Sequence, residues 1–163
     1  MPQSQDIELS VNGEQVQANV KVRTNLVDFL RDQLGLTGSH VGCEQGVCGA
    51  CTMEVNGVMV RGCLMLAVQA DGAVVSTIEG FSDKVTGKKL QSAFVQHNAL
   101  QCGFCTPGML ASSIEYIDQG GTTDRDAIRK HLSGNYCRCT GYQSIVDAVV
   151  TVIEEESSTG AAQ

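Results

Sequence analysis

The eight cysteines of this chain fall into two sets of four, and they constrain its fold more than any other feature. The first set is spaced C-x4-C-x2-C-x11-C and consists of Cys43, Cys48, Cys51 and Cys63. The second set joins a C-x2-C step to a distant C-x-C step and consists of Cys102, Cys105, Cys137 and Cys139. No cysteine lies outside these sets. The chain must therefore fold so that the members of each set can converge.

Two kinds of site use four converging cysteines, namely an iron–sulfur cluster and a structural zinc ion. Zinc ribbons pair two short C-x2-C steps, whereas the first set has the spacing that holds a 2Fe–2S cluster in plant-type ferredoxins. The first set therefore predicts a 2Fe–2S cluster, a centre that passes single electrons. Small residues that leave backbone N–H groups free to approach its sulfurs are Gly42, Gly46, Gly49 and Ala50. The spacing of the second set is less diagnostic and leaves zinc open.

Charge and composition exclude some partners and suggest a compartment. The formal net charge is −7, and cysteine thiolates around a cluster would make it more negative, which argues against nucleic-acid binding. No stretch approaches the roughly 18 apolar residues of a transmembrane helix. Residues 1–6 lack the basic and apolar regions of a signal peptide. We therefore expect a cytoplasmic location without membrane insertion, where closely spaced cysteines suit metal binding better than disulfides.

The first half of the chain predicts a small sheet with one helix. Apolar residues alternate with polar ones around Asn12-Gly13 and again around Asn56-Gly57, and both dipeptides favour the type I′ turn of a β-hairpin. A helix over residues 26–34 follows the first hairpin, and a loop rich in glycine and cysteine covers residues 38–51. A last strand follows the second hairpin. This order predicts a β-grasp, ferredoxin-like domain whose loop surrounds the first cluster.

The second half shows helical periodicity instead. We expect one helix over residues 89–97 and three more whose N-caps are Thr106, Thr123 and Thr140. Each cysteine pair of the second set lies just before one of these helices, so two packed helical hairpins would bring the pairs together. Helix N-termini would then point their positive dipole ends at a negatively charged cluster. The predicted fold class is α+β, with a ferredoxin-like domain over 1–80, an all-α four-helix bundle over 81–156 and a disordered tail over 157–163.

Three long motifs resemble the small iron–sulfur subunit of the molybdenum hydroxylases, the family that includes xanthine oxidase, aldehyde oxidoreductase and carbon monoxide dehydrogenase. They are CEQGVCGACT at residues 43–52, QCGFCTPGM at 101–109 and NYCRCTGY at 135–142. The motifs occur in the family's order, and the resemblance extends over most of the chain without a departure at any ligand position. The resemblance implies that the second set also holds a 2Fe–2S cluster.

The resemblance also implies partners and a direction of electron flow. A large molybdopterin subunit would hydroxylate a small organic substrate or oxidise CO, and a medium subunit would hold FAD, in a dimer of heterotrimers. Single electrons would pass from molybdenum to the helical-domain cluster, then to the ferredoxin-like cluster, and then to FAD or another acceptor. This chain would carry electrons and contain no catalytic residue. Gln101 and Cys139 resemble the residues that contact the pterin, although Gln101 could also be an ordinary loop residue.

The histidines and Arg138 are weaker candidates. His40 lies close to the first cysteine, but a Rieske-type centre needs two histidines in place of two cysteines, and four cysteines are already present. His97 and His131 fall on predicted helices, where a surface or packing role is simplest. Arg138 lies between two predicted ligands and could tune the second cluster or contact a partner.

Two other classes of function compete with an electron-transfer subunit. A free-standing ferredoxin would lack the helical half and would purify without molybdenum or larger subunits. A structural zinc protein would contain zinc and no acid-labile sulfide.

Overall fold

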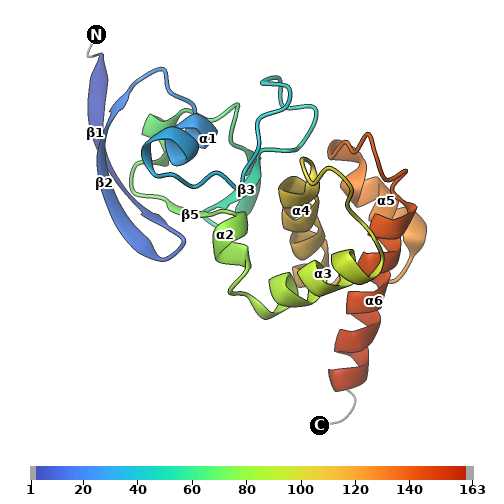
Figure 1. The fold of residues 1–163 in the computed structure, drawn as a ribbon. Coiled ribbons are helices and arrows are strands. Elements are labelled where there is room, and N and C mark those ends of the chain that lie inside the picture. The colour runs from blue at the N-terminus through green and yellow to red at the C-terminus, as the bar shows by residue number, and fades with distance from the viewer. Residues whose placement is uncertain (1–2, 161–163) are drawn as a thin grey trace.

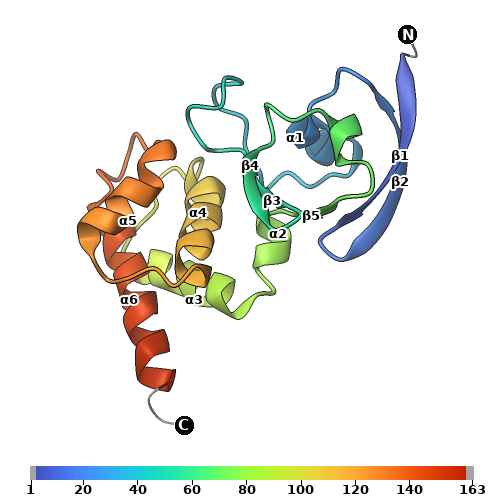
Figure 2. The same ribbon diagram turned by 180° about the vertical axis from the view of Figure 1, so that it is seen from behind.

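A sheet domain and a helical domain lie side by side in the computed structural model, which describes residues 3–160 (Figure 1). The strands are β1 (Ser4–Val11), β2 (Glu14–Lys21), β3 (Thr52–Val55), β4 (Val58–Arg61) and β5 (Val74–Ser76). The helices are α1 (Leu26–Asp28), α2 (Ile78–Phe81), α3 (Val85–Gln96), α4 (Thr106–Asp118), α5 (Arg125–His131) and α6 (Gln143–Gly160). Both views place the cysteine-bearing loops at one end of the molecule and the end of α6 at the other (Figures 1 and 2).

The five-stranded sheet has the order β2-β1-β5-β3-β4, in which β1 and β5 run parallel and the other neighbouring pairs antiparallel. Both predicted hairpins are present. Their turns place Asn12 and Gly13 at φ of 52° and 88°, and Asn56 and Gly57 at 51° and 80°, which is the pair of positive values that a type I′ turn requires. This arrangement confirms the predicted ferredoxin-like sheet domain.

The predicted helix between the hairpins packs on the sheet and contributes Leu26, Phe29 and Leu30 to the core. Its N-cap is Asn25, whose side-chain oxygen accepts a hydrogen bond of 2.8 Å from the Asp28 amide. Only its first residues are α-helical, because a π-helical segment (Phe29–Gln33) continues α1. Sequence periodicity did not reveal this change of pitch.

The helical domain packs α3, α4 and α6 around an apolar core that also contains Phe81 from α2. This confirms the helical second domain. The helix starts differ from those predicted. The N-cap of α4 is Cys105 and not Thr106, and the N-cap of α5 is Asp124, whose carboxylate accepts from the Asp126 amide, and not Thr123. Helix α3 begins four residues before the predicted Lys89, at Val85.

The two ends of the helical domain also differ from the prediction. Strand β5 ends at Ser76, and Ile78 already packs against the helical core, so this core begins slightly before residue 80. Helix α6 continues to Gly160. The tail predicted to be disordered from residue 157 is therefore helical over 157–160, and residues 161–163 lie outside the described part of the chain. No helix over residues 3–160 is long and apolar enough to cross a membrane.

Candidate iron–sulfur sites

The first cysteine set lies on the loop that precedes β3 and on the turn that follows β4. Three loop residues have positive φ, namely Glu44 at 54°, Gly46 at 78° and Gly49 at 75°. The chain therefore curls back on itself, and the amides of Gln45 and Cys48 point at the Cys43 sulfur from 3.4 and 3.5 Å. Such N–H groups favour a charged sulfur.

The thiols of the first set have unequal acidities. Hydrogen bonds from the Gln45 and Cys48 backbones lower the pKa of Cys43 to about 6. Burial, together with the neighbouring thiols of Cys63 and Cys48, raises the pKa of Cys51 to about 11. The Cys43 side chain interacts with Cys48, and the Cys51 side chain interacts mainly with Cys63 and more weakly with Cys48.

The second set also forms two pairs. The sulfurs of Cys102 and Cys139 lie 3.6 Å apart on the surface. Cys105, at the start of α4, interacts with Cys137, and burial raises the pKa of Cys105 to about 12. Burial also acts to raise the pKa of Cys137, but hydrogen bonds from the Thr140 side chain and backbone outweigh it and lower that pKa.

Paired thiols are the donor set that a two-iron cluster uses, because each of its irons takes two protein ligands. No group of three or more His, Cys, Asp or Glu side chains among residues 3–160 could hold a single metal ion. The donors fit a 2Fe–2S group in two further respects. In each set, backbone or hydroxyl donors are directed at one sulfur, Cys43 in the first and Cys137 in the second, and the loops bend through positive-φ residues around the thiols.

The two cysteine loops touch each other at a seam between the domains. The Tyr136 amide donates a hydrogen bond of 2.8 Å to the carbonyl oxygen of Cys48. The buried side chain of Asn135 donates to the carbonyl of Gly49 at 3.1 Å and accepts from the Ser112 hydroxyl at 2.9 Å. Asn135 thus connects the first cysteine loop to α4 and to the segment that leads into Cys137.

Glycines allow the backbones at this seam to approach closely. A Cβ atom at Gly108 in α4 would lie 2.0 Å from the carbonyl oxygen of Gly49, and one at Gly49 would lie 2.6 Å from the carbonyl oxygen of Gly134. Arg61, at the end of β4, donates to that Gly134 carbonyl at 2.8 Å and to the Thr52 hydroxyl. Larger residues at Gly49 or Gly108 would push the domains apart.

The weaker candidates from the sequence are not thiol partners. His40 stacks on Phe104 with 4.7 Å between ring centroids, and its Nδ1 lies 2.8 Å from the Phe104 carbonyl oxygen. His40 therefore joins the domains, a role for which the sequence held no signal. His97 contacts Thr151, and His131 pairs with Glu115.

Two candidates lie beside the exposed end of the second set. The Gln101 side-chain amide donates to the carbonyl oxygen of Cys139 at 3.0 Å, so the structure brings the two predicted pterin-contacting residues together on the surface. Arg138 is also exposed there.

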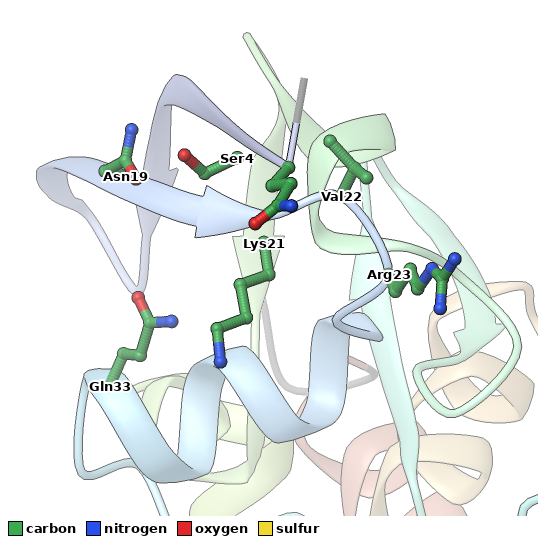
Figure 3. Close-up of a pocket in the computed structure, with 7 residues that line it drawn as sticks. Ser4, Asn19, Lys21, Val22, Arg23 and Gln33 are labelled. Carbon is green, nitrogen blue, oxygen red and sulfur yellow. The ribbon is translucent and has the colours of Figure 1, made fainter. Parts of the chain in front are cut away.

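A large hollow elsewhere contains no cysteine. It lies between the open end of the first hairpin and the π-helical segment, where the Lys21 side chain extends toward that segment and Gln33 lines the opposite wall (Figure 3). Its lining residues are polar and exposed except Val22, which is apolar and half-buried. The position of this hollow separates it from both thiol sets.

Comparison with known proteins identifies a 2Fe–2S domain in each half of the chain. A family model described as a 2Fe-2S iron-sulfur cluster binding domain matches residues 9–74, and a second, described as a 2Fe-2S binding domain, matches residues 77–150. Caffeine dehydrogenase subunit gamma of Pseudomonas sp. (strain CBB1) is 49% identical over 151 residues, which cover 90% of this chain and 89% of that one. Nicotine 6-hydroxylase small subunit of Paenarthrobacter nicotinovorans is 48% identical over 145 residues, covering 89% and 87%.

Solved structures show the same fold. A chain of quinoline 2-oxidoreductase from Pseudomonas putida 86 superposes with a TM-score of 0.90 at 44% identity, covering 98% of this chain and 99% of that one. In aldehyde oxidoreductase from Desulfovibrio gigas the match has a TM-score of 0.85 at 39% identity and covers 95% of this chain but 17% of that longer chain. The chain therefore belongs to the small 2Fe–2S iron–sulfur subunits of the molybdenum hydroxylase family.

Proposed function

We propose that this electron-transfer subunit passes single electrons from a molybdopterin subunit, through two 2Fe–2S clusters, to FAD or another acceptor. The observation that carries the proposal is that a loop from each four-thiol set meets the other at one seam. A 2Fe–2S cluster supplies one-electron redox chemistry when bound. Two such centres would divide a two-electron oxidation into single steps.

We infer the ligand pairs from which thiols interact most strongly. Cys43 with Cys48, and Cys51 with Cys63, would each hold one iron of the ferredoxin-like cluster. Cys102 with Cys139, and Cys105 with Cys137, would do the same for the helical-domain cluster. The backbone amides at Cys43 and the Thr140 hydroxyl at Cys137 stabilise negative charge on the sulfurs and so favour reduction.

The exposed Cys102–Cys139 pair and Gln101 would form the face toward the pterin, and electrons would leave from the ferredoxin-like domain. The partners would be a large molybdopterin subunit and a medium FAD subunit, in a dimer of heterotrimers within a reducing cytoplasm. By their names, relatives act on caffeine and nicotine, which favours an N-heterocyclic substrate. Its chemistry would occur in the large subunit.

Low-temperature EPR of the reduced native protein tests this function. We expect two distinct 2Fe–2S signals, about four irons per chain, and copurification with a molybdenum-containing subunit. A single signal, or zinc without acid-labile sulfide, would refute the assignment of the second set. Two signals from a protein that purifies alone would support a free-standing ferredoxin instead.

Replacing Gln101 tests the pterin-facing role. In the assembled enzyme, Gln101→Ala should leave both EPR signals intact but slow reduction of the clusters by substrate severalfold, because the amide that would contact the pterin is lost. Gln96→Ala, at an exposed position at the end of α3, is the control and should change nothing. Unchanged reduction kinetics in Gln101→Ala would make Gln101 an ordinary loop residue.

A further inference from the structure

A hydrogen bond at the seam joins the main chains of the two ligand-bearing loops. Cys137 is bonded through one peptide link to Tyr136, and the Tyr136 amide donates to the carbonyl oxygen of Cys48 at 2.8 Å. Both cysteines are proposed ligands, one in each cluster. A continuous route therefore runs from the Cys137 sulfur along the main chain, across a single hydrogen bond, and down the Cys48 side chain to its sulfur.

We propose that the hydrogen bond from Tyr136 N–H to Cys48 C=O is the electronic bridge between the two clusters; this rests on the proposed function. Electron tunnelling weakens less per ångström along covalent and hydrogen bonds than across van der Waals gaps. With both clusters bound, one electron would leave the reduced helical-domain cluster, which would return to its oxidised state, and would enter the oxidised ferredoxin-like cluster. No bond is broken and no proton is transferred.

Neighbouring contacts hold both ends of this bridge in place. Asn135 precedes Tyr136, and Gly49 follows Cys48, so the hydrogen bond from the Asn135 side chain to the Gly49 carbonyl runs beside the bridge. Asn135 is only 3% exposed, and its oxygen accepts from Ser112 in α4. Asn135 is thus a positioning residue, which fixes the donor and the acceptor relative to each other without lying on the route.

A second contact between the loops offers a poorer route. Phe104 lies between the proposed ligands Cys102 and Cys105, and its ring lies over Gly42, where a Cβ atom would approach it to 3.4 Å. That is a van der Waals contact, and the ring is 46% exposed. An electron that used the Phe104 ring would have to cross a through-space gap. The contact of 2.8 Å between the Phe104 carbonyl oxygen and His40 Nδ1 avoids that gap, but it reaches Cys43 only through the further residues Val41 and Gly42.

The bridge can be removed without replacing a ligand. Tyr136→Pro deletes the N–H group, and the preceding Asn135 has φ −120° and ψ 117°, a conformation that tolerates a following proline. Tyr136→Ala is the matched control, because it removes the exposed ring and keeps the amide. Phe104→Leu tests the alternative route. Replacing Tyr136 with its α-hydroxy acid, which turns the amide into an ester, removes the donor even if proline disturbs the loop.

The measurements use the full chain with both clusters bound. EPR of the fully reduced protein reports cluster content and the magnetic coupling between the clusters, and freeze-quenched samples after pulsed reduction report the rate at which they equilibrate. We expect Tyr136→Pro and the ester variant to retain two signals and their midpoint potentials, to lose the exchange part of the coupling, and to equilibrate severalfold more slowly. Tyr136→Ala and Phe104→Leu should match the unmodified chain.

The results separate this proposal from the proposed function. Two clusters with unchanged coupling and rate in both Tyr136→Pro and the ester variant would overturn the bridge while leaving the electron-transfer function intact. A slow rate in Phe104→Leu alone would assign the route to the ring. Absence of one cluster from the unmodified chain would instead refute the proposed function itself.

Discussion

At the scale of single residues, the hydroxyl of Thr140 could either cap a helix or donate a hydrogen bond to a cysteine sulfur, and the structure shows the second role. Its spacing before a helix predicts an N-cap, but its hydroxyl donates to the Cys137 sulfur at 3.1 Å and accepts from the Tyr142 amide at 3.2 Å. Tyr142 in turn has a φ of 69°, so α6 begins only at Gln143. A capping motif cannot be distinguished from a sulfur donor by sequence alone.

The hydroxyl of Thr140 should tune the second cluster. Thr140→Val removes a hydrogen bond to the sulfur of Cys137, a proposed ligand, so negative charge on that sulfur is less stabilised and the midpoint potential should fall. A net hydrogen-bond contribution of about 0.5–1.5 kcal/mol corresponds to a decrease of about 20–60 mV in the midpoint potential of a one-electron couple. An EPR-monitored redox titration measures it, with Thr140→Ser as the control that keeps the donor. A potential that rises or stays constant in Thr140→Val would contradict this role.

Individual elements were predictable where local chemistry decides them. Both hairpins follow from Asn-Gly turns, and the helical periodicity of the second half corresponds to the buried face of α6, which contributes Ile145, Val149 and Val152 to the core. The helix starts were less predictable, because several polar residues near each start compete to cap it. At α5 the Asp124 carboxylate is the cap and the Thr122 hydroxyl accepts from the Asp124 amide, which leaves the predicted Thr123 without that role.

One ion pair joins α5 to α6. Arg125 donates to Asp147 at 2.6 Å, and this hydrogen bond lowers the pKa of Asp147 below its ordinary 3.8. The carboxylate therefore stabilises the fold fully above pH 3.8, and the contribution is lost as the pH falls through the lowered value. Because both side chains are partly exposed, Asp147→Asn should reduce the free energy of unfolding by only about 0.2–1 kcal/mol at neutral pH.

Urea unfolding at pH 7 and pH 3 measures this effect. The difference between Asp147→Asn and the unmodified chain should shrink at the lower pH. Asp126→Asn is the control, because Asp126 pairs with Arg129 while remaining 90% exposed, and its effect should be smaller. A difference that grows on acidification would contradict the assigned sign.

The whole molecule depends on contacts that no local pattern encodes. The cysteine spacings and motifs identified two cluster domains, but the seam joins residues far apart in the chain through carbonyls, a buried amide and glycines. Asn135 lay inside a recognised motif, yet nothing in the sequence indicated that it would bind Gly49. Such long-range pairing follows from how the two domains pack.

Gly108 tests how tightly that seam is packed. Alanine normally stabilises a helix by about 1 kcal/mol relative to glycine, but a Cβ here would lie 2.0 Å from the Gly49 carbonyl oxygen. In Gly108→Ala this clash should outweigh the gain in helix propensity and lower the free energy of unfolding by about 1–3 kcal/mol. Thermal unfolding of the cluster-loaded chain measures it. Ser92→Ala, exposed on α3, should be neutral or mildly stabilising, and stabilisation by Gly108→Ala would show that the seam is loose.

The contact between Tyr136 and Cys48 is made by main-chain groups alone. Any residue except proline supplies the same N–H group at position 136, and the side chain there is 57% exposed. The side chain at position 136 can therefore change, for example to fit a different partner, while the main-chain hydrogen bond to Cys48 is retained. Such a subunit can serve enzymes with different substrates, because the proposed route of electron transfer uses main-chain atoms and does not depend on the exposed side chain at position 136.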